Sequence, residues 1–159
     1  MKVKDVMKTN VGFCATKDSL MKAAEIMLRR DCGVVPVVDE TNRVVGMITD
    51  RDLCLAVVAR NRKASDVKIG ELINGKAIVC LPDEKLEDVL RKMRKHQIKR
   101  LAAVNNNGEL VGILSVNDIF LAVGKDKNLK KKIVSTLKAI SKPRPIVLRE
   151  VADGKQPVN

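Results

Sequence analysis

Apolar and polar residues are spaced with two different periods in the first part of the chain. Between residues 18 and 30 the apolar residues recur at the spacing of one helix face. The residues expected to face inward are Leu20, Ala23, Ala24, Met27 and Leu28. Two short apolar runs follow, at 34–38 and 44–48, separated by a polar turn. This pattern predicts a helix, a β-hairpin and then a second helix over about residues 50–60.

The same pattern returns at a constant offset along the chain, with Val45-Gly46 aligned to Val111-Gly112, and the alignment needs no gap. It predicts a helix from Asp83 to His96, a hairpin of strands 101–104 and 110–114, and a helix over 116–124. The inward positions of its first helix are Leu86, Val89, Leu90 and Met93. Apolar positions match almost throughout, which indicates a duplicated β-α-β-β-α unit.

One such unit buries too little apolar surface to be stable alone, so we expect the two to pack face to face. The expected organisation is repeat 1 at 1–62, repeat 2 at 63–124, and a basic C-terminal helix and tail at 125–159.

Each hairpin ends in a hydroxyl residue followed three positions later by an aspartate, Thr49 with Asp52 and Ser115 with Asp118. A hydroxyl at a helix start lies beside unpaired backbone N–H groups, which favour a phosphate. The carboxylate would repel a phosphate but can accept hydrogen bonds from a ribose diol. A nucleoside phosphate offers both groups. The alternative is a capping box that stabilises the helix without any ligand.

Two β-α-β-β-α units with the motifs Gly46-Met-Ile-Thr49-Asp-Arg-Asp52 and Gly112-Ile-Leu-Ser115-Val-Asn-Asp118 resemble the CBS-domain family over about residues 1–124. The resemblance implies an α/β (α+β) Bateman module of the stand-alone bacterial or archaeal type, with its repeats related by a pseudo-twofold axis and often dimeric. Members bind AMP, ADP, ATP, S-adenosylmethionine, NAD-type or cyclic dinucleotides, and they regulate an attached or partner protein.

The resemblance also implies two clefts, each combining one motif with the other repeat. Cleft A is expected to contain Met47, Thr49, Arg51, Asp52, Ala77, Ile78, Lys99 and Arg100. Cleft B is expected to contain Asn10, Gly12, Gly33, Val34, Ile113, Ser115 and Asp118. Because Lys99-Arg100 is basic, cleft A is the expected phosphate-binding cleft, whereas cleft B suits an uncharged adenosyl group or stays empty. The alternative for the basic pair is a solvated strand edge.

The residue types argue against catalysis and metal binding. The chain has one histidine, His96, at a predicted helix end, and no serine–histidine, cysteine–histidine or paired-carboxylate motif, so we expect no enzymatic activity. Its four cysteines form no C-x-x-C pair, so we expect neither a metal site nor an obligatory cofactor. With two Phe, no Tyr and no Trp, a flat ligand would be held by aliphatic side chains. That composition also disfavours single-stranded nucleic acid.

The chain shows neither a membrane-spanning apolar run nor a secretory signal, so we expect a cytoplasmic location. The net charge is +12, of which residues 125–159 carry +7, from ten Lys/Arg and three Asp/Glu. Within them, 126–141 form a predicted helix with one apolar stripe: Leu129, Ile133, Leu137 and Ile140. This helix either docks on the module or a dimer partner, or binds an acidic partner, a membrane surface or nucleic acid.

Three functions therefore stay open at this point. The first is an adenine-nucleotide sensor that signals to a partner protein. The second is a nucleic-acid-associated regulator that uses the basic tail. The third is a ligand-free dimerisation module in which the two motifs act only as helix caps.

Overall fold

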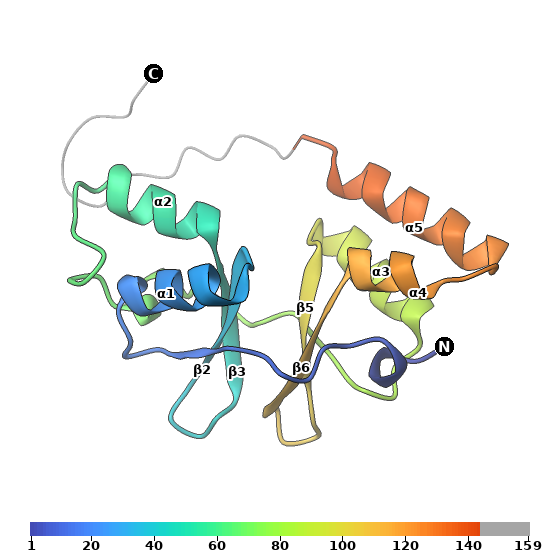
Figure 1. Cartoon of the computed structure of the whole chain (residues 1–159), viewed down its shortest axis with the longest axis horizontal. Coiled ribbons are helices and arrows are strands. Elements are labelled where there is room, and N and C mark those ends of the chain that lie inside the picture. Colours follow the sequence, from blue (N-terminus) through green and yellow to red (C-terminus); the bar gives the residue numbers. More distant parts are fainter. Residues whose placement is uncertain (144–159) are drawn as a thin grey trace. The chain divides into compact units, whose positions relative to one another are not determined.

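The structure is a computed structural model that describes residues 1–143. It contains two compact units, which we describe separately (Figure 1). Unit 1 consists of residues 1–11, 41–44 and 76–143, and unit 2 consists of residues 12–40 and 45–75. Each unit contains a three-stranded sheet with helices packed on it, so the predicted α/β class and the duplicated β-α-β-β-α order are confirmed.

Unit 2 is built around the sheet order β1-β2-β3, with β1 parallel to β2. Its elements are β1 (Cys14–Ala15), α1 (Leu20–Arg30), β2 (Val34–Val38), β3 (Val44–Thr49), α2 (Asp50–Val58) and the 3-10 helix η2 (Ile69–Leu72). Both helices pack on one face of the sheet, where Leu20 of α1 and Leu53 of α2 meet Val35, Val37 and Ile48 in one core. Figure 1 shows α1 and α2 on the same side of β2 and β3.

Unit 1 repeats this arrangement in the sheet β4-β5-β6, with β4 parallel and β6 antiparallel to β5. Its elements are η1 (Val3–Asp5), β4 (Val79–Cys80), α3 (Leu86–His96), β5 (Arg100–Val104), β6 (Leu110–Ser115), α4 (Val116–Ala122) and α5 (Lys127–Ile140). All four residues predicted to face inward on α3 are buried, as expected for a helix covered on two sides.

The segment that leads into each repeat packs on the other repeat. Val3 is fully buried in the core of unit 1, where its N–H donates to the Glu84 carbonyl (3.0 Å). Lys2 and Lys4 both contact the Asp83 carboxylate, at 2.9 and 2.8 Å. In unit 2, Val67 is fully buried and its carbonyl accepts from the N–H of Leu20 (3.0 Å). These units describe packing; the repeat boundaries 1–62, 63–124 and 125–159 stay a prediction about the duplicated sequence.

Helix α5 lies along α3 in unit 1 (Figure 1). Leu129, Ile133 and Thr136 are buried, and the Thr136 hydroxyl contacts the carbonyl of Leu90 (3.4 Å). The expectation that this helix docks on the module is confirmed. Leu137, which was expected in the buried stripe, is 37% exposed, because residues 129, 133 and 136 follow the 3.6-residue period more closely.

Helix α1 lacks such a cover within the described chain. Ala24 and Leu28 were expected to face inward, but both are exposed, Leu28 by 84%. Their counterparts in the second repeat are Leu90, which is buried, and Arg94, which donates to the Ser135 hydroxyl of α5 (3.3 Å). The repeat pattern therefore predicts the same helix face in both repeats, while within residues 1–143 a further helix, α5, covers that face in repeat 2 but not in repeat 1.

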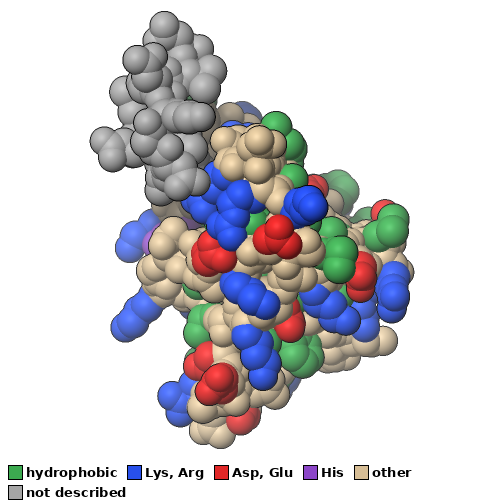
Figure 2. Space-filling view, turned by 90° about the vertical axis from the view of Figure 1, so that its left-hand side faces the viewer, with side chains coloured by type: hydrophobic (Ala, Val, Ile, Leu, Met, Phe, Trp, Pro, Cys, Tyr) green, Lys and Arg blue, Asp and Glu red, His purple; other side chains and the backbone are tan. Residues whose placement is uncertain are grey.

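Charged side chains of both signs share the surface. On the face seen in Figure 2, Lys and Arg side chains are interspersed with Asp and Glu. No helix within residues 1–143 is both long enough and apolar enough to cross a bilayer.

Candidate ligand-binding site

The first motif lies where β3 ends and α2 begins. The backbone N–H and the hydroxyl of Thr49 both donate to Oδ2 of Asp52, at 2.9 and 2.7 Å. The N–H of Asp52 donates back to the Thr49 hydroxyl oxygen (3.2 Å). This is a complete capping box, so the capping interpretation of the motif is confirmed. Because all of these bonds use Oδ2, Oδ1 of Asp52 has no further partner within residues 1–143.

The second motif repeats this geometry where β6 meets α4. Ser115 donates to Oδ2 of Asp118 from its N–H (2.8 Å) and from its hydroxyl (2.5 Å). Here, however, Oδ1 also has a partner, because the Lys8 ammonium lies 3.2 Å away. Burial raises the pKa of Asp118, but the two Ser115 bonds and the Lys8 contact outweigh burial and hold this pKa below its ordinary value. The second aspartate is therefore already paired as an anion.

The cap geometry changes the expected role of the hydroxyl. In each motif the hydroxyl proton points to the carboxylate, so the hydroxyl would have to turn to donate to a phosphate. At the start of α2, the Asp50 N–H donates to the Gly33 carbonyl (3.2 Å) and the Arg51 N–H to the Asp50 carboxylate (2.8 Å). Because these N–H groups already have acceptors and the Asp50 carboxylate adds negative charge, the start of α2 is poorly suited to bind a phosphate. A phosphate would have to meet basic side chains instead.

The basic pair Lys99-Arg100 lies at the start of the second hairpin, and both residues are exposed. Arg100 is opposite Ser115 in the β5–β6 register, and the Lys99 carbonyl accepts from the Val116 N–H (3.0 Å). Neither side chain forms an ion pair with any residue in the described part of the chain. Within unit 1, then, the pair adjoins the Ser115 motif.

The residues predicted for each cleft are divided between the units. Unit 2 holds Met47, Thr49, Arg51 and Asp52 of cleft A, and Gly12, Gly33 and Val34 of cleft B. Unit 1 holds Ala77, Ile78, Lys99 and Arg100 of cleft A, and Asn10, Ile113, Ser115 and Asp118 of cleft B. Each unit thus brings together one motif and one hairpin start, and the combination of the two sets into clefts stays a prediction.

Lys8 is a functional candidate that the sequence reasoning missed. Its backbone exchanges two hydrogen bonds with Ile113, a predicted cleft B residue, both at 2.9 Å. In the repeat alignment Lys8 corresponds to the uncharged Asn74, which shows that the two repeats differ here but gives no sign of the contact with Asp118.

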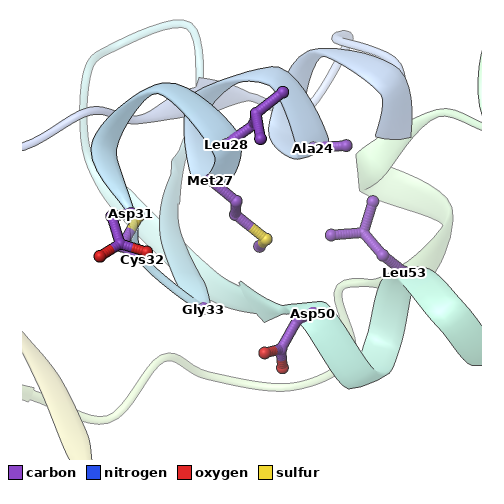
Figure 3. A pocket seen from close by; sticks show the side chains of 8 residues that line it. All are labelled: Ala24, Met27, Leu28, Asp31, Cys32, Gly33, Asp50 and Leu53. Atoms are coloured by element: carbon purple, nitrogen blue, oxygen red, sulfur yellow. The ribbon is translucent and has the colours of Figure 1, made fainter.

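An open hollow of 490 Å³ lies on unit 2, between α1 and α2 (Figure 3). Its lining is Ala24, Met27, Leu28, Asp31, Cys32, Gly33, Asp50 and Leu53. Figure 3 shows apolar side chains of both helices around the opening, with the carboxylate of Asp50 at its edge. Of the predicted site residues it contains Gly33 alone, so the hollow differs from the Thr49–Asp52 site.

The four cysteines are free thiols. Burial raises the pKa of Cys14 to about 11 and that of Cys80 to about 12. Both are therefore protonated at neutral pH and behave as small apolar side chains. Among residues 1–143, no three His, Cys, Asp or Glu side chains lie together as a metal ion would require.

Comparison with known proteins shows which family the chain resembles. Residues 3–59 and 69–125 each match the CBS domain. The CBS domain-containing protein YhcV of Bacillus subtilis is 37% identical over 130 residues, which cover 79% of this chain and 86% of that protein. YlbB of the same organism, an uncharacterized protein, is 34% identical over 122 residues, covering 76% and 81%.

Solved structures give the same result. The CBS domain pair of protein MJ0100, in complex with 5′-methylthioadenosine and S-adenosyl-L-methionine, is 30% identical with a TM-score of 0.69, covering 80% of this chain and 98% of that one. Hypoxic Response Protein I, with two coordinated zinc ions, is 26% identical with a TM-score of 0.70, covering 76% and 98%. The chain therefore belongs to the CBS domain family and carries two such domains in tandem.

Proposed function

We propose that this protein is a regulatory module that binds an adenosyl ligand, either AMP, ADP or ATP or S-adenosylmethionine, and signals its presence to a partner protein. The observation that carries the proposal is the Asp52 carboxylate. Two bonds from Thr49 fix its Oδ2, and its Oδ1 is open to a donor from outside the chain. A CBS domain pair that is 30% identical binds two adenosyl compounds, which supports the same ligand class here.

In this proposal the ligand lies in cleft A, and each group of the ligand has a matching side chain. Asp52 accepts hydrogen bonds from the ribose hydroxyls, since hydrogen bonds to a charged acceptor contribute about 1.5–3 kcal/mol each. Lys99 and Arg100, with Arg51, neutralise a phosphate or a carboxylate group. Met47, Ala77 and Ile78 contact the adenine ring through aliphatic surface, in keeping with the lack of Tyr and Trp.

Cleft B is the second proposed site. It combines Asp118 and Ser115 with uncharged residues, and it suits an adenosyl group without phosphates. The residues proposed for it are Asn10, Gly12, Gly33, Val34, Ile113, Ser115 and Asp118.

Signalling requires that the ligand bind two conformations of the module with different affinities. We infer that a homodimer provides these states and that a partner protein recognises one of them. This role is regulatory and involves no catalysis by the chain itself.

The test is Asp52→Asn, measured by isothermal titration calorimetry with AMP, ADP, ATP, S-adenosylmethionine and 5′-methylthioadenosine. Asparagine keeps an oxygen that accepts the Thr49 N–H but removes the charge that holds the ribose. We expect a loss of affinity of roughly tenfold or more.

Asp126→Asn is the matched control. Asp126 caps α5 by accepting from the N–H groups of Asn128 and Leu129, both at 2.9 Å, and no ligand role is proposed for it. Binding should be unchanged in this variant. If none of these five compounds binds the wild-type chain, or if Asp52→Asn affects only thermal stability as Asp126→Asn does, the motifs are helix caps and the proposal is wrong.

A further inference from the structure

Asp52 and Asp118 differ in how many of their carboxylate oxygens already have a partner within the chain. Oδ2 of Asp118 accepts two bonds from Ser115, and its Oδ1 lies 3.2 Å from the Lys8 ammonium. Oδ2 of Asp52 accepts the same two bonds from Thr49, but its Oδ1 has no partner within residues 1–143. A ribose hydroxyl meets an open oxygen at Asp52 and an occupied one at Asp118.

Lys8 is held in place by its backbone. Its N–H donates to the Ile113 carbonyl and its carbonyl accepts from the Ile113 N–H, both at 2.9 Å. Residues 7 and 8 therefore lie against β6 at Ile113, which precedes Ser115 by two positions. The side chain of Lys8 is 72% exposed while that of Asp118 is 13% exposed, so the ammonium covers the carboxylate from the solvent side.

The equivalent place in repeat 1 carries no charge. A Cβ added to Gly112 would lie 2.8 Å from the sulfur of Met7, and one added to Gly46 would lie 2.7 Å from Cδ1 of Ile73. Met7 aligns with Ile73 in the duplicated sequence, as Gly46 does with Gly112, so the leading segments contact the two sheets in the same register. Asn74 is the residue that aligns with Lys8 in the sequence; the two backbone bonds between Lys8 and Ile113 have no counterpart between Asn74 and Met47 within residues 1–143.

We propose that Lys8 makes the two repeats unequal, because its ammonium competes with the ribose of an adenosyl ligand for Asp118. The Asp52 site then fills first, and the Asp118 site fills at higher ligand concentration. This inference rests on the proposed function and adds to it the residue that sets the order of binding.

The size of the effect follows from the exposure of Lys8. Ion pairs with one exposed partner contribute little, so loss of the competition should raise affinity about two- to fivefold. Salt screens the pair, so the difference should shrink between roughly 0.05 and 0.5 M salt.

The experiment uses 5′-methylthioadenosine, which has no net charge, so that Lys8 has no phosphate to attract. In an Asp52→Asn chain, which leaves the Asp118 site to be measured, Lys8→Asn should tighten binding two- to fivefold by calorimetry. The reverse graft, Asn74→Lys in the wild-type chain, should weaken the tighter site by a similar factor.

Each result has a separate meaning. Unchanged or weaker binding in the Lys8→Asn chain, or two equal sites in the wild-type chain, overturns the competition. If the wild-type chain binds none of AMP, ADP, ATP, S-adenosylmethionine and 5′-methylthioadenosine, the proposed function itself fails, before Lys8 is considered. Because Asn74→Lys changes an exposed residue in the other unit, it tests the idea even if Lys8→Asn folds poorly.

Discussion

Asp52 and Asp118 are oriented by their own hydroxyl neighbours before any ligand arrives. Each carboxylate is fixed by two bonds from a residue three positions earlier. Binding of a ligand to such a carboxylate would therefore cost little conformational entropy of the aspartate side chain. The same bonds stabilise the starts of α2 and α4. Helix capping uses Oδ2 of each carboxylate, and the proposed ligand of Asp52 would use Oδ1, so the two interpretations of that motif are compatible.

Two carboxylates of unit 1 link its stability to pH. Lys4 and Lys2, by hydrogen bonds and charge, lower the pKa of Asp83 to about 2, and the pKa of Asp118 is also lowered, as described above. A carboxyl whose pKa is lower in the folded than in the unfolded chain stabilises the fold when the pH is above its unfolded-state pKa, near 4. This stabilisation is lost as the pH falls through the folded-state pKa. We predict that acidification from pH 4 to 2 weakens unit 1, measured by the protection of its amides from hydrogen exchange.

Asp83→Asn is the control for this effect. It removes the charge that Lys2 and Lys4 contact, so the acid-dependent loss should become smaller in this variant. A loss that is unchanged in Asp83→Asn would show that other carboxylates are responsible.

At the scale of elements, the packing of α5 explains why two similar helices are buried to different extents. The hydrophobic period places both α1 and α3 correctly, with Leu20 and Leu86 fully buried at equivalent positions. It cannot say whether the next turn, Ala24 or Leu90, is covered, because that depends on a helix outside the repeat. The sequence predicts which face of each helix is apolar, whereas the element that packs on that face is determined by the tertiary structure.

We predict that Ile133→Ala lowers the free energy of unfolding by about 2–5 kcal/mol, because Ile133 is 1% exposed in the core of unit 1. Chemical denaturation followed by circular dichroism would measure it. Val134→Ala is the matched control, since Val134 is 52% exposed on the same helix and should change stability by less than about 0.5 kcal/mol. Equal effects of the two variants would mean that α5 does not dock as described.

At the scale of the molecule, the sequence predicts the duplicated fold and both capping motifs, because these depend on residues within a few positions of each other. It does not predict the Lys8–Asp118 pair, whose partners lie near opposite ends of the repeat region, nor the packing of residues 1–11 with the second repeat. Contacts of this kind leave no periodic signal. They follow from how the complete chain packs.

The exchanged leading segments can be tested with a symmetric pair of variants. Val3→Ala removes buried methyl groups from the core of unit 1, and Val67→Ala does so in unit 2. We predict a cost of about 2 kcal/mol in each case. In hydrogen exchange, Val3→Ala should lower the protection of α3 more than that of α1, and Val67→Ala should do the reverse. The opposite pattern, or an equal loss in both helices, would contradict the assignment of these segments.

The placement of residues 1–11 has a consequence for the order of events on the ribosome. Val3 finds its hydrogen-bond partner at Glu84, which is synthesised only after the whole of repeat 1. At roughly 5–20 residues per second, this segment waits about 4–16 seconds with its apolar side chains uncovered. Repeat 1, completed by Val67 and Ile69, can close its core earlier, so residues 1–11 are translated before that core is complete but find their own place after it.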